Sequence, residues 1–321
     1  KEVDAKNTIV FARYHENFEK VNHSALNDEI ELSSPETEVK RFKYNDSILR
    51  TLKWGTLLSS SDEALCIFSL IEKKGKHLNQ LLNYDLSIGQ GLNVAKSLVV
   101  EKEILEKFPF LNKTLIPFMR TEDGAPFVLQ ETNGFIIDGS QLTREEIKRL
   151  KSAGIDIFKP ESTSKFKPLL IMPRGVSRHY CAANSISAYS SSGVDIYDNK
   201  ENLPEEMKLN LWLFLNSSIA WLIREITGRK SLGGGLLKAE ATDLREMPIY
   251  FEFSNANEIK KIYEKLRKRK ALPTTEEINT PEHKKIDEIV FDYLEMHPRQ
   301  RLSVVELLKN HILNRITKSK T

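Results

Sequence analysis

The sequence has little cysteine, no long hydrophobic run and almost no excess of charge. Its two cysteines, Cys66 and Cys181, are too few for a disulfide framework or for a CxxC-type zinc site. Its longest apolar runs are about five residues, as in LWLFL at 211–215, far below the ~20 residues of a membrane-spanning helix. The pattern of a signal peptide is not found in these residues. These absences argue against a secreted or membrane protein, and we expect a cytoplasmic one.

The charge balance alone indicates no partner. Lysine and arginine total 48 and the acidic residues 45, a net charge of +3. A nucleic-acid partner must therefore be inferred from where the cations lie. The composition, 40% hydrophobic and 29% charged, is that of a globular protein, and 321 residues are enough for about two domains. Because the first residue is Lys1 rather than methionine, we expect a piece of a longer protein.

The motifs of several common catalytic sites are also missing. The nearest stretch to a nucleotide-binding G-x-x-x-x-G-K-[ST] loop is 228–234, which has Gly234 where the lysine should be. There is no H-E-x-x-H and no G-x-S-x-G. His179 and Cys181 lie two apart without a second pair, so no metal site is predicted. Asp195, Asp198 and Lys200 can be aligned with a D…DxK pattern, which leaves a metal-dependent nuclease open as an alternative to solvated surface.

The predicted elements indicate an α+β fold in three regions. Residues 1–77 mix strand-like and helical segments; 78–252 contain short strand-like runs separated by turn residues; and 253–321 are helical. Within the β-rich region, Thr143 and Glu146 form a capping box for an inserted helix. The middle region is therefore predicted to be a β-rich domain with inserted helices, followed by a helical C-terminal module.

Longer helices are predicted in the second half of the chain. One apolar helix is expected from Pro204 to Thr227, buried on nearly all faces. In the tail, helices are predicted to open near Asn255, Pro281 and Ser303. The last two carry apolar stripes, so we expect them to pack against each other.

Cations cluster in two segments of the β-rich region. Segment 165–180 holds Lys165, Lys167, Arg174 and Arg178 without an acid. Arginine can contact a guanine edge through two hydrogen bonds, and the Gly175 backbone can approach a phosphate closely. The two lysines are expected to position the DNA backbone rather than read bases. The alternative is a solvated turn after a core strand.

Segment 226–238 repeats this combination of cations and glycine. It contains Arg229, Lys230 and Lys238 around Gly233, Gly234 and Gly235, again without an acid. Consecutive glycines expose amides to an anion, although a permissive hairpin turn would use them too. A third basic run, 260–270, is interpreted as a solvated helix face.

Several segments resemble the C-terminal region of prokaryotic N6-adenine DNA methyltransferases of restriction–modification systems. They are IMPRGVSRHYCAA (171–183), SSSGVDIY (190–197), the stretch from LWLFL to LREMPI (211–249), LSIGQGLNVAKS (86–97) and the helical tail at 286–318. The resemblance covers about residues 85–320, and its glycine-rich part is the most specific. In that family this region is a target-recognition domain. The resemblance implies that 1–77 is a remnant or linker from the end of the catalytic domain, 78–252 the target-recognition domain and 253–321 the helical module.

The family's catalytic motifs are absent. Neither the F-x-G-x-G turn for S-adenosylmethionine nor the N-P-P-[YF] loop for the flipped adenine occurs in the chain. We therefore expect no catalytic residue and no cofactor here, with S-adenosylmethionine implied for the parent enzyme. The implied partners are double-stranded DNA and a methyltransferase catalytic domain in cis or trans, in the cytoplasm and associated with the nucleoid. The expected contact residues are the cations and glycines above, with Gln90 and Asn93 as adenine readers or as an ordinary capped turn.

Three other interpretations remain at this point. One is the nuclease centred on Asp195. Another is a type I-like specificity subunit, a scaffold that usually carries two recognition domains related by an internal repeat, of which this sequence shows one. The last is a region that binds partner subunits only, against which the acid-free basic segments argue.

Overall fold

The computed structural model describes most of the chain. The described residues are 8–14, 37–43, 61–77, 85–92, 98–120, 124–158, 167–191, 193–229, 236–250 and 252–317. The chain divides into two compact units, 1–70 and 71–321. In the first unit, β1 (Thr8–Tyr14) pairs antiparallel with β2 (Thr37–Lys43), and α4 (Asp62–Lys74) begins there and runs into the second. The predicted DNA-contact residues all belong to the second unit.

A five-stranded sheet forms the centre of the second unit. Its strands come from distant parts of the sequence, in the order β4 (Leu86–Gln90), β13 (Gly193–Asp198), β9 (Leu170–Pro173), β11 (Ala182–Asn184) and β7 (Val128–Leu129). All neighbours are antiparallel except β11 and β7. Both faces of β9 and β13 are buried. In each strand two adjacent residues, which point to opposite faces, are almost fully enclosed: Leu170 and Ile171 in β9, and Val194 and Asp195 in β13. These apolar runs explain why the sheet lies inside the unit.

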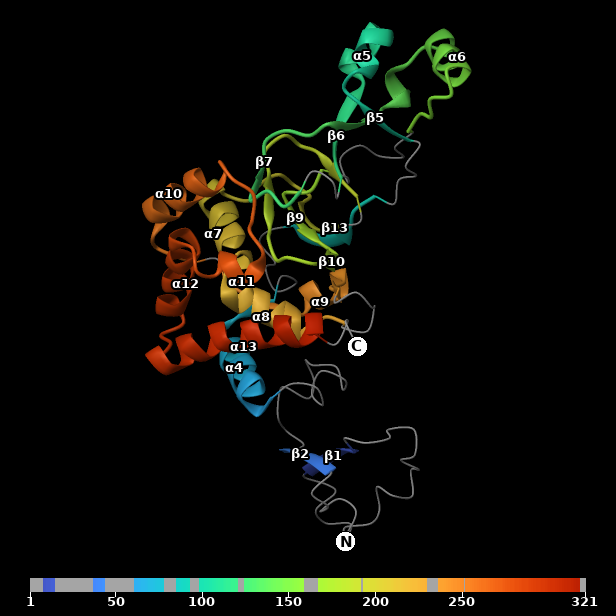
Figure 1. Ribbon diagram of the computed structural model, residues 1–321. Coiled ribbons are helices and arrows are strands. Elements are labelled where there is room, and N and C mark those ends of the chain that lie inside the picture. The colour runs from blue at the N-terminus through green and yellow to red at the C-terminus, as the bar shows by residue number, and fades with distance from the viewer. Residues whose placement is uncertain are drawn as a thin grey trace. The chain divides into compact units, whose positions relative to one another are not determined.

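A smaller four-stranded sheet carries the inserted helices. Its order is β12 (Tyr189–Ser190), β6 (Leu115–Met119), β8 (Gly134–Ile137) and β5 (Val99–Glu101). Helices α5 (Ile104–Lys107) and α6 (Arg144–Ser152) lie beside it (Figure 1). The capping box at Thr143 and Glu146 is confirmed, with both reciprocal hydrogen bonds present. Leu111, Ile137 and Leu150 form the core beneath these helices.

The apolar helix expected over 204–227 is in fact two helices. These are α7 (Glu205–Leu215) and α8 (Ser218–Thr227). Asn216 interrupts them because its side chain accepts from the Cys181 amide at 2.8 Å and donates to the Cys181 carbonyl at 3.0 Å. Ser217 then caps α8 by accepting from the Ala220 amide. Both helices are buried on most faces, as predicted.

The remaining helices follow in the last third of the chain: α9 (Ala241–Arg245), α10 (Ala256–Leu266), α11 (Thr274–Glu277), α12 (Pro281–Tyr293) and α13 (Pro298–Thr317). The start of α12 at Pro281 is confirmed, whereas α13 begins at Pro298 rather than near Ser303. Even α13, at 20 residues, is not apolar enough to cross a bilayer, and neither is any other helix described.

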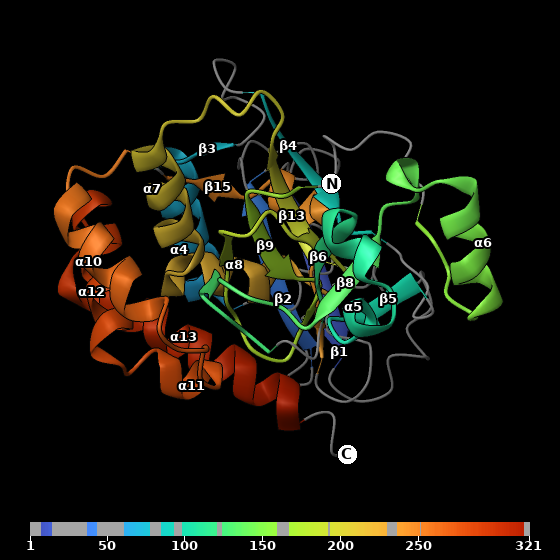
Figure 2. The same cartoon turned by 90° about the horizontal axis from the view of Figure 1, so that it is seen from above.

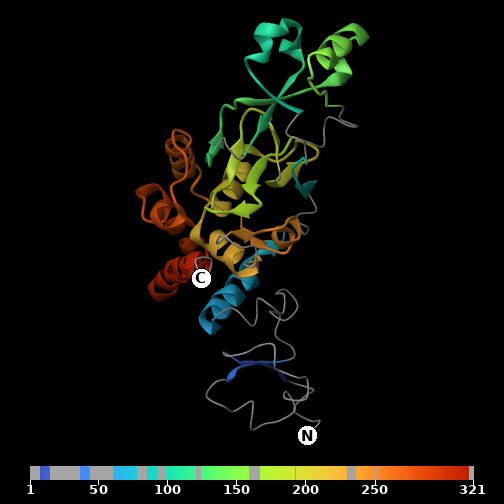
Figure 3. The same cartoon turned by 45° about the vertical axis from the view of Figure 1, so that its right-hand side comes forward.

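The packing of the C-terminal helices differs from the sequence prediction. Helix α13 packs chiefly on α8, and α12 packs on α10 and α7, so α12 and α13 do not mainly cover each other. Figures 2 and 3 show α10 and α12 on the side of the central strands away from α6. The fold is α+β, as predicted, but the helical segment shares its core with the β-rich region.

Candidate nucleic-acid interface

The two cation-rich segments of the β-rich region lie side by side. Strand β10 (Gly175–Val176) pairs antiparallel with β14 (Leu237–Lys238), which places Gly175 opposite Lys238. Arg229 joins on the other side of Lys238 through two backbone hydrogen bonds of 2.9 Å. Segments far apart in the sequence thus form one surface. Six of the predicted residues lie outside the described part of the chain: Asn93, Lys165, Lys230, Gly233, Gly234 and Gly235.

Three of the predicted contact side chains converge on Glu240. We call Gln90, Arg174, Lys238 and Glu240 the Glu240 cluster. Arg174 donates from Nε at 2.9 Å and from Nη2 at 3.0 Å to the two carboxylate oxygens. Lys238 Nζ lies 2.8 Å from Oε1, and Gln90 Nε2 donates to Oε2 at 3.0 Å. The hydrogen bonds from Arg174 and Lys238 lower the pKa of Glu240 to about 2.

The cluster fixes Arg174 without using all of its donors. A guanidinium has five N–H groups, and Glu240 takes one from Nε and one from Nη2. The three remaining N–H groups are held in a defined direction by this two-point contact. The side chain is about one-third exposed, at 32%. Arg174 can therefore donate to a ligand, while the carboxylate reduces the local charge of Arg174 and Lys238 from two to one.

Glu240 was not among the predicted residues, because it lies just beyond segment 226–238. In extended backbone, residues two apart point to the same face, so Lys238 and Glu240 could have been matched as neighbours. Arg174 could not, because its approach depends on pairing between two strands that are distant in the sequence. The segments are acid-free in sequence, yet a carboxylate lies at the centre of their surface.

The other described candidates have separate positions. Arg178 donates from Nη1 to the Ala271 carbonyl at 2.7 Å and is partly buried. Arg229 and Lys167 are exposed, and within the described residues their side chains have no ion pair. Gly175 is exposed, and a Cβ there would lie 3.2 Å from a Leu236 methyl group, a tight contact. Their role in binding DNA remains a prediction.

A buried network of His179, Glu225 and Arg315 lies behind this surface and contacts β10. His179 Nε2 lies 2.9 Å from Glu225 Oε1, and Arg315 Nη2 donates to the same oxygen at 2.8 Å. Arg315 also donates to the Val176 carbonyl at 3.1 Å, which ties α13 to β10. Burial lowers the pKa of His179 to about 4, so its ring is neutral at pH 7. Burial would raise the pKa of Glu225, but hydrogen bonds from His179 and Arg315 lower it to about 2.

The geometry does not favour the nuclease interpretation. Asp195 and Asp198 are three apart on β13 and so point to opposite faces. Asp195 is fully buried and accepts from Ser190 Oγ at 2.5 Å and the Tyr197 hydroxyl at 3.1 Å; burial raises its pKa to about 7. Asp198 accepts from the Asn202 and Leu203 amides. Among the residues described, no group of three or more His, Cys, Asp or Glu side chains could hold a metal ion.

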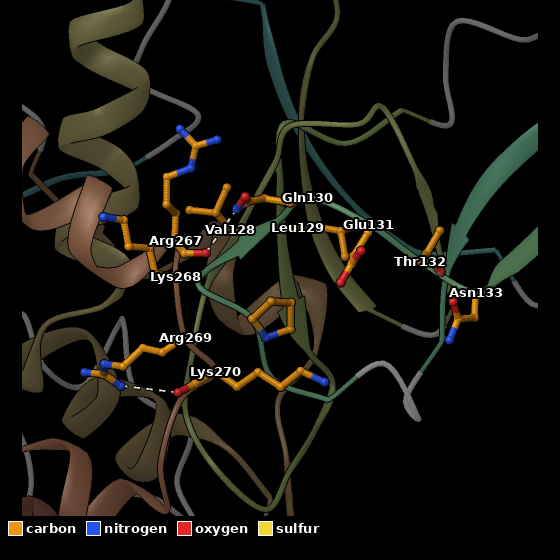
Figure 4. Close-up of a pocket in the computed structure, with 11 residues that line it drawn as sticks. Val128, Leu129, Gln130, Glu131, Thr132, Asn133, Arg267, Lys268, Arg269 and Lys270 are labelled. Carbon is orange, nitrogen blue, oxygen red and sulfur yellow. Dashed lines mark hydrogen bonds between the residues drawn. The ribbon is translucent and has the colours of Figure 1, made fainter.

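A second cationic region surrounds an open pocket of about 800 Å³. One side is formed by β7 and the following residues Gln130–Asn133, and the other by the turn Arg267–Lys270 (Figure 4). This turn was predicted as part of a helix face, but α10 ends at Leu266. Two hydrogen bonds then hold the turn to the residues on either side of β7: the Gln130 side chain donates from Nε2 to the Arg267 carbonyl at 3.1 Å, and the Ala271 amide donates to the Ala125 carbonyl at 2.7 Å.

The comparisons with known proteins concern the fold. No protein-family model matches the sequence, and neither does any curated protein. The chain is similar in structure to the type IIG restriction endonuclease BpuSI, with a TM-score of 0.54 and 15% identity, over 98% of this chain and 41% of that one. It also matches the type IIL restriction–modification enzyme MmeI, solved in complex with DNA, at a TM-score of 0.41 and 13% identity over 73% and 36%.

The first likeness shows a shared fold, whereas the second, with its lower TM-score, does not establish one. The chain spans less than half the length of either enzyme. The chain thus shares the fold of a type IIG restriction endonuclease, in agreement with the resemblance in its sequence.

Proposed function

We propose that this chain recognises a DNA sequence on behalf of an adenine-specific restriction–modification enzyme. The observation that carries the proposal is the pairing of β10 with β14, which gathers two distant cation-rich segments into one surface. The fold shared with a type IIG restriction endonuclease supports the same class of partner. Such a role would place the protein on the chromosome, in the cytoplasm.

Arg174 is the proposed base reader of this surface. Its guanidinium is oriented by Glu240 and keeps three N–H groups for a ligand, and a two-point contact to guanine O6 and N7 is the commonest specific arginine contact. Gln90 can exchange its bond to Glu240 for an adenine edge. Arg229, Lys167 and Lys238 would contact phosphates, which fix the position of the duplex without reading its sequence.

Methylation itself would require a catalytic domain, in cis or in trans. That domain would bind S-adenosylmethionine and receive an adenine turned out of the duplex, since the reacting atom cannot be reached inside the stack. The recognition surface would hold the duplex in register during this step. We accordingly expect calorimetry on residues 1–321 to find no stoichiometric S-adenosylmethionine site; a site in this chain would contradict the assignment of roles.

Selection from a randomised duplex library at fixed salt tests the proposal. The full chain should enrich one short sequence, and its affinity should fall steeply with salt as phosphate contacts release counterions. The Arg174→Ala variant is compared with the parent chain and should enrich the same site less strictly at one position. Binding without any enriched sequence would contradict a recognition role.

A further inference from the structure

The turn Arg267–Lys270 contains two kinds of cation. Arg269 is structural: it donates to both oxygens of the fully buried Glu277 at 2.7 and 2.6 Å and lies 5.3 Å over the Phe127 ring. Lys268 and Lys270 are exposed, and their side chains have no ion pair or hydrogen bond among the described residues. Figure 4 shows the Lys270 side chain extended along the pocket, with Arg269 turned away from it. One arginine thus fixes the turn and leaves two lysines available to a ligand.

The chemistry of the pocket fits an extended anion better than a small molecule. Small-molecule sites are mostly apolar and enclosed, whereas this pocket is open and its wall carries the polar residues Gln130–Asn133 opposite the cations. Glu131 is the one acid among the lining residues. Arg267 pairs with Glu264 at 3.1 Å, but both side chains are more than 40% exposed, so that pair is weak and Arg267 can turn to a ligand.

We propose that this pocket is a second nucleic-acid contact, which binds the phosphodiester backbone of duplex DNA without reading its sequence. The inference rests on the proposed function for its ligand, but not on the Glu240 cluster for its evidence. Lysine is a compact charge on a flexible stem, suited to phosphate oxygens rather than to the fixed pattern of a base edge. The anchored turn holds these charges at the edge of the sheet instead of on a mobile tail.

One hydrogen bond connects the pocket with the recognition surface. Arg178 follows Gly175 by three residues, and its guanidinium contacts the carbonyl of Ala271, next to Lys270. The backbone site and the predicted base-reading site therefore belong to one packed structure. Phosphate contacts at the pocket would fix the duplex relative to Arg174 as well as add affinity.

The test replaces both lysines and measures binding to a duplex without a preferred site. Lys268→Gln/Lys270→Gln should lower nonspecific affinity and reduce the log–log salt slope by about 2, one for each lost phosphate contact. Lys284→Gln/Lys285→Gln removes the same charge from the exposed face of α12 and should leave the slope nearly unchanged. Lys268→Arg/Lys270→Arg keeps the charge and should bind like the parent.

The possible outcomes separate the pocket from the proposed function. If the pocket and control variants show the same salt slope, the pocket does not bind DNA, while the selection of a DNA site by the parent chain is unaffected by this result. Salt-sensitive binding that depends on the two lysines, but without any preferred sequence, would support the pocket and contradict recognition. If the parent chain does not bind duplex DNA, both proposals fail. Thermal unfolding of each variant confirms that the compared proteins are folded.

Discussion

The Glu240 cluster and the turn Arg267–Lys270 use cations in opposite ways. In the cluster, a partly exposed carboxylate gathers Arg174 and Lys238 and gives the arginine a direction. In the turn, the buried Glu277 binds Arg269, which is then not available to a ligand. Lys268 and Lys270 have no ionic partner within the described residues. A count of charges along the sequence ranks the run 260–270 as the most basic of the three segments and says nothing of these different arrangements. Their carboxylates decide which cations are oriented and which are merely available.

The largest expected effect separates Arg269 from its neighbours. Arg269→Ala leaves the Glu277 carboxylate buried without its two-point partner, so we expect a loss of about 3 kcal/mol in the free energy of unfolding. Lys268→Ala, the adjacent exposed position, should change it by less than about 0.5 kcal/mol. Urea unfolding measures both. Equal losses would mean that Arg269 does not anchor the turn.

A somewhat smaller effect is expected for the predicted base reader. Arg174→Ala should cost about 1–3 kcal/mol of binding on the preferred duplex and relax selection at one base pair. Lys238→Ala should weaken binding to all duplexes alike, because a lysine on this surface is expected to contact phosphate. Competition binding at fixed salt distinguishes the two. If Arg174→Ala weakens binding to all duplexes equally, Arg174 does not read a base.

Glu240→Gln tests whether the carboxylate orients Arg174 or only reduces charge. The amide keeps the shape but loses the charge-assisted two-point contact, so discrimination should fall by about 1 kcal/mol. Nonspecific affinity should rise, because the cluster gains one positive charge, with a salt slope steeper by about 1. A variant that binds more tightly yet selects as strictly as the parent would show that orientation by Glu240 is unimportant.

The smallest expected effect is that of pH on site preference. The pKa of Glu240 is lowered in the folded protein, because Arg174 and Lys238 donate hydrogen bonds to it. A carboxyl with a lowered pKa contributes stability above its unfolded pKa of about 4.3, and this contribution is lost only as the pH falls through the folded value. That value is about 2. The preference for one DNA sequence, measured between pH 8 and pH 5, should therefore not change. A loss of this preference between these two pH values would mean that the protonation of a group other than Glu240 controls it.

Local signals were the part of the fold that the sequence predicted well. The capping box at Thr143 and Glu146 and the start of α12 at Pro281 depend on residues within one turn of helix, and both are present. The break between α7 and α8 could not be predicted, since Asn216 finds its partner, Cys181, 35 residues away. The packing of α13 on α8 likewise depends on the buried contact between Arg315 and Glu225.

In the candidate site, too, local features could be predicted and long-range contacts could not. Residue type and glycine content identified the segments of Arg174 and Lys238, which the structure brings together. The contact of Arg174 with Glu240 could not be predicted without knowing how the strands pair. The exposed positions of Lys268 and Lys270 on a turn could not be predicted without knowing that α10 ends at Leu266. Sequence patterns thus located the cations, while long-range contacts determined what each one can do.

On this protein an oriented arginine, Arg174, is proposed to read the DNA sequence, whereas Lys268 and Lys270, which have no ionic partner among the described residues, are proposed to contact the DNA backbone. The most direct measurement is competition binding of the parent chain, Arg174→Ala and Lys268→Gln/Lys270→Gln over one randomised duplex library at fixed salt. We expect relaxed selection at a single base pair for the arginine variant, and unchanged selection with weaker binding to every duplex for the lysine variant. If the arginine variant keeps the parental preference while the lysine variant changes it, the two roles are assigned wrongly.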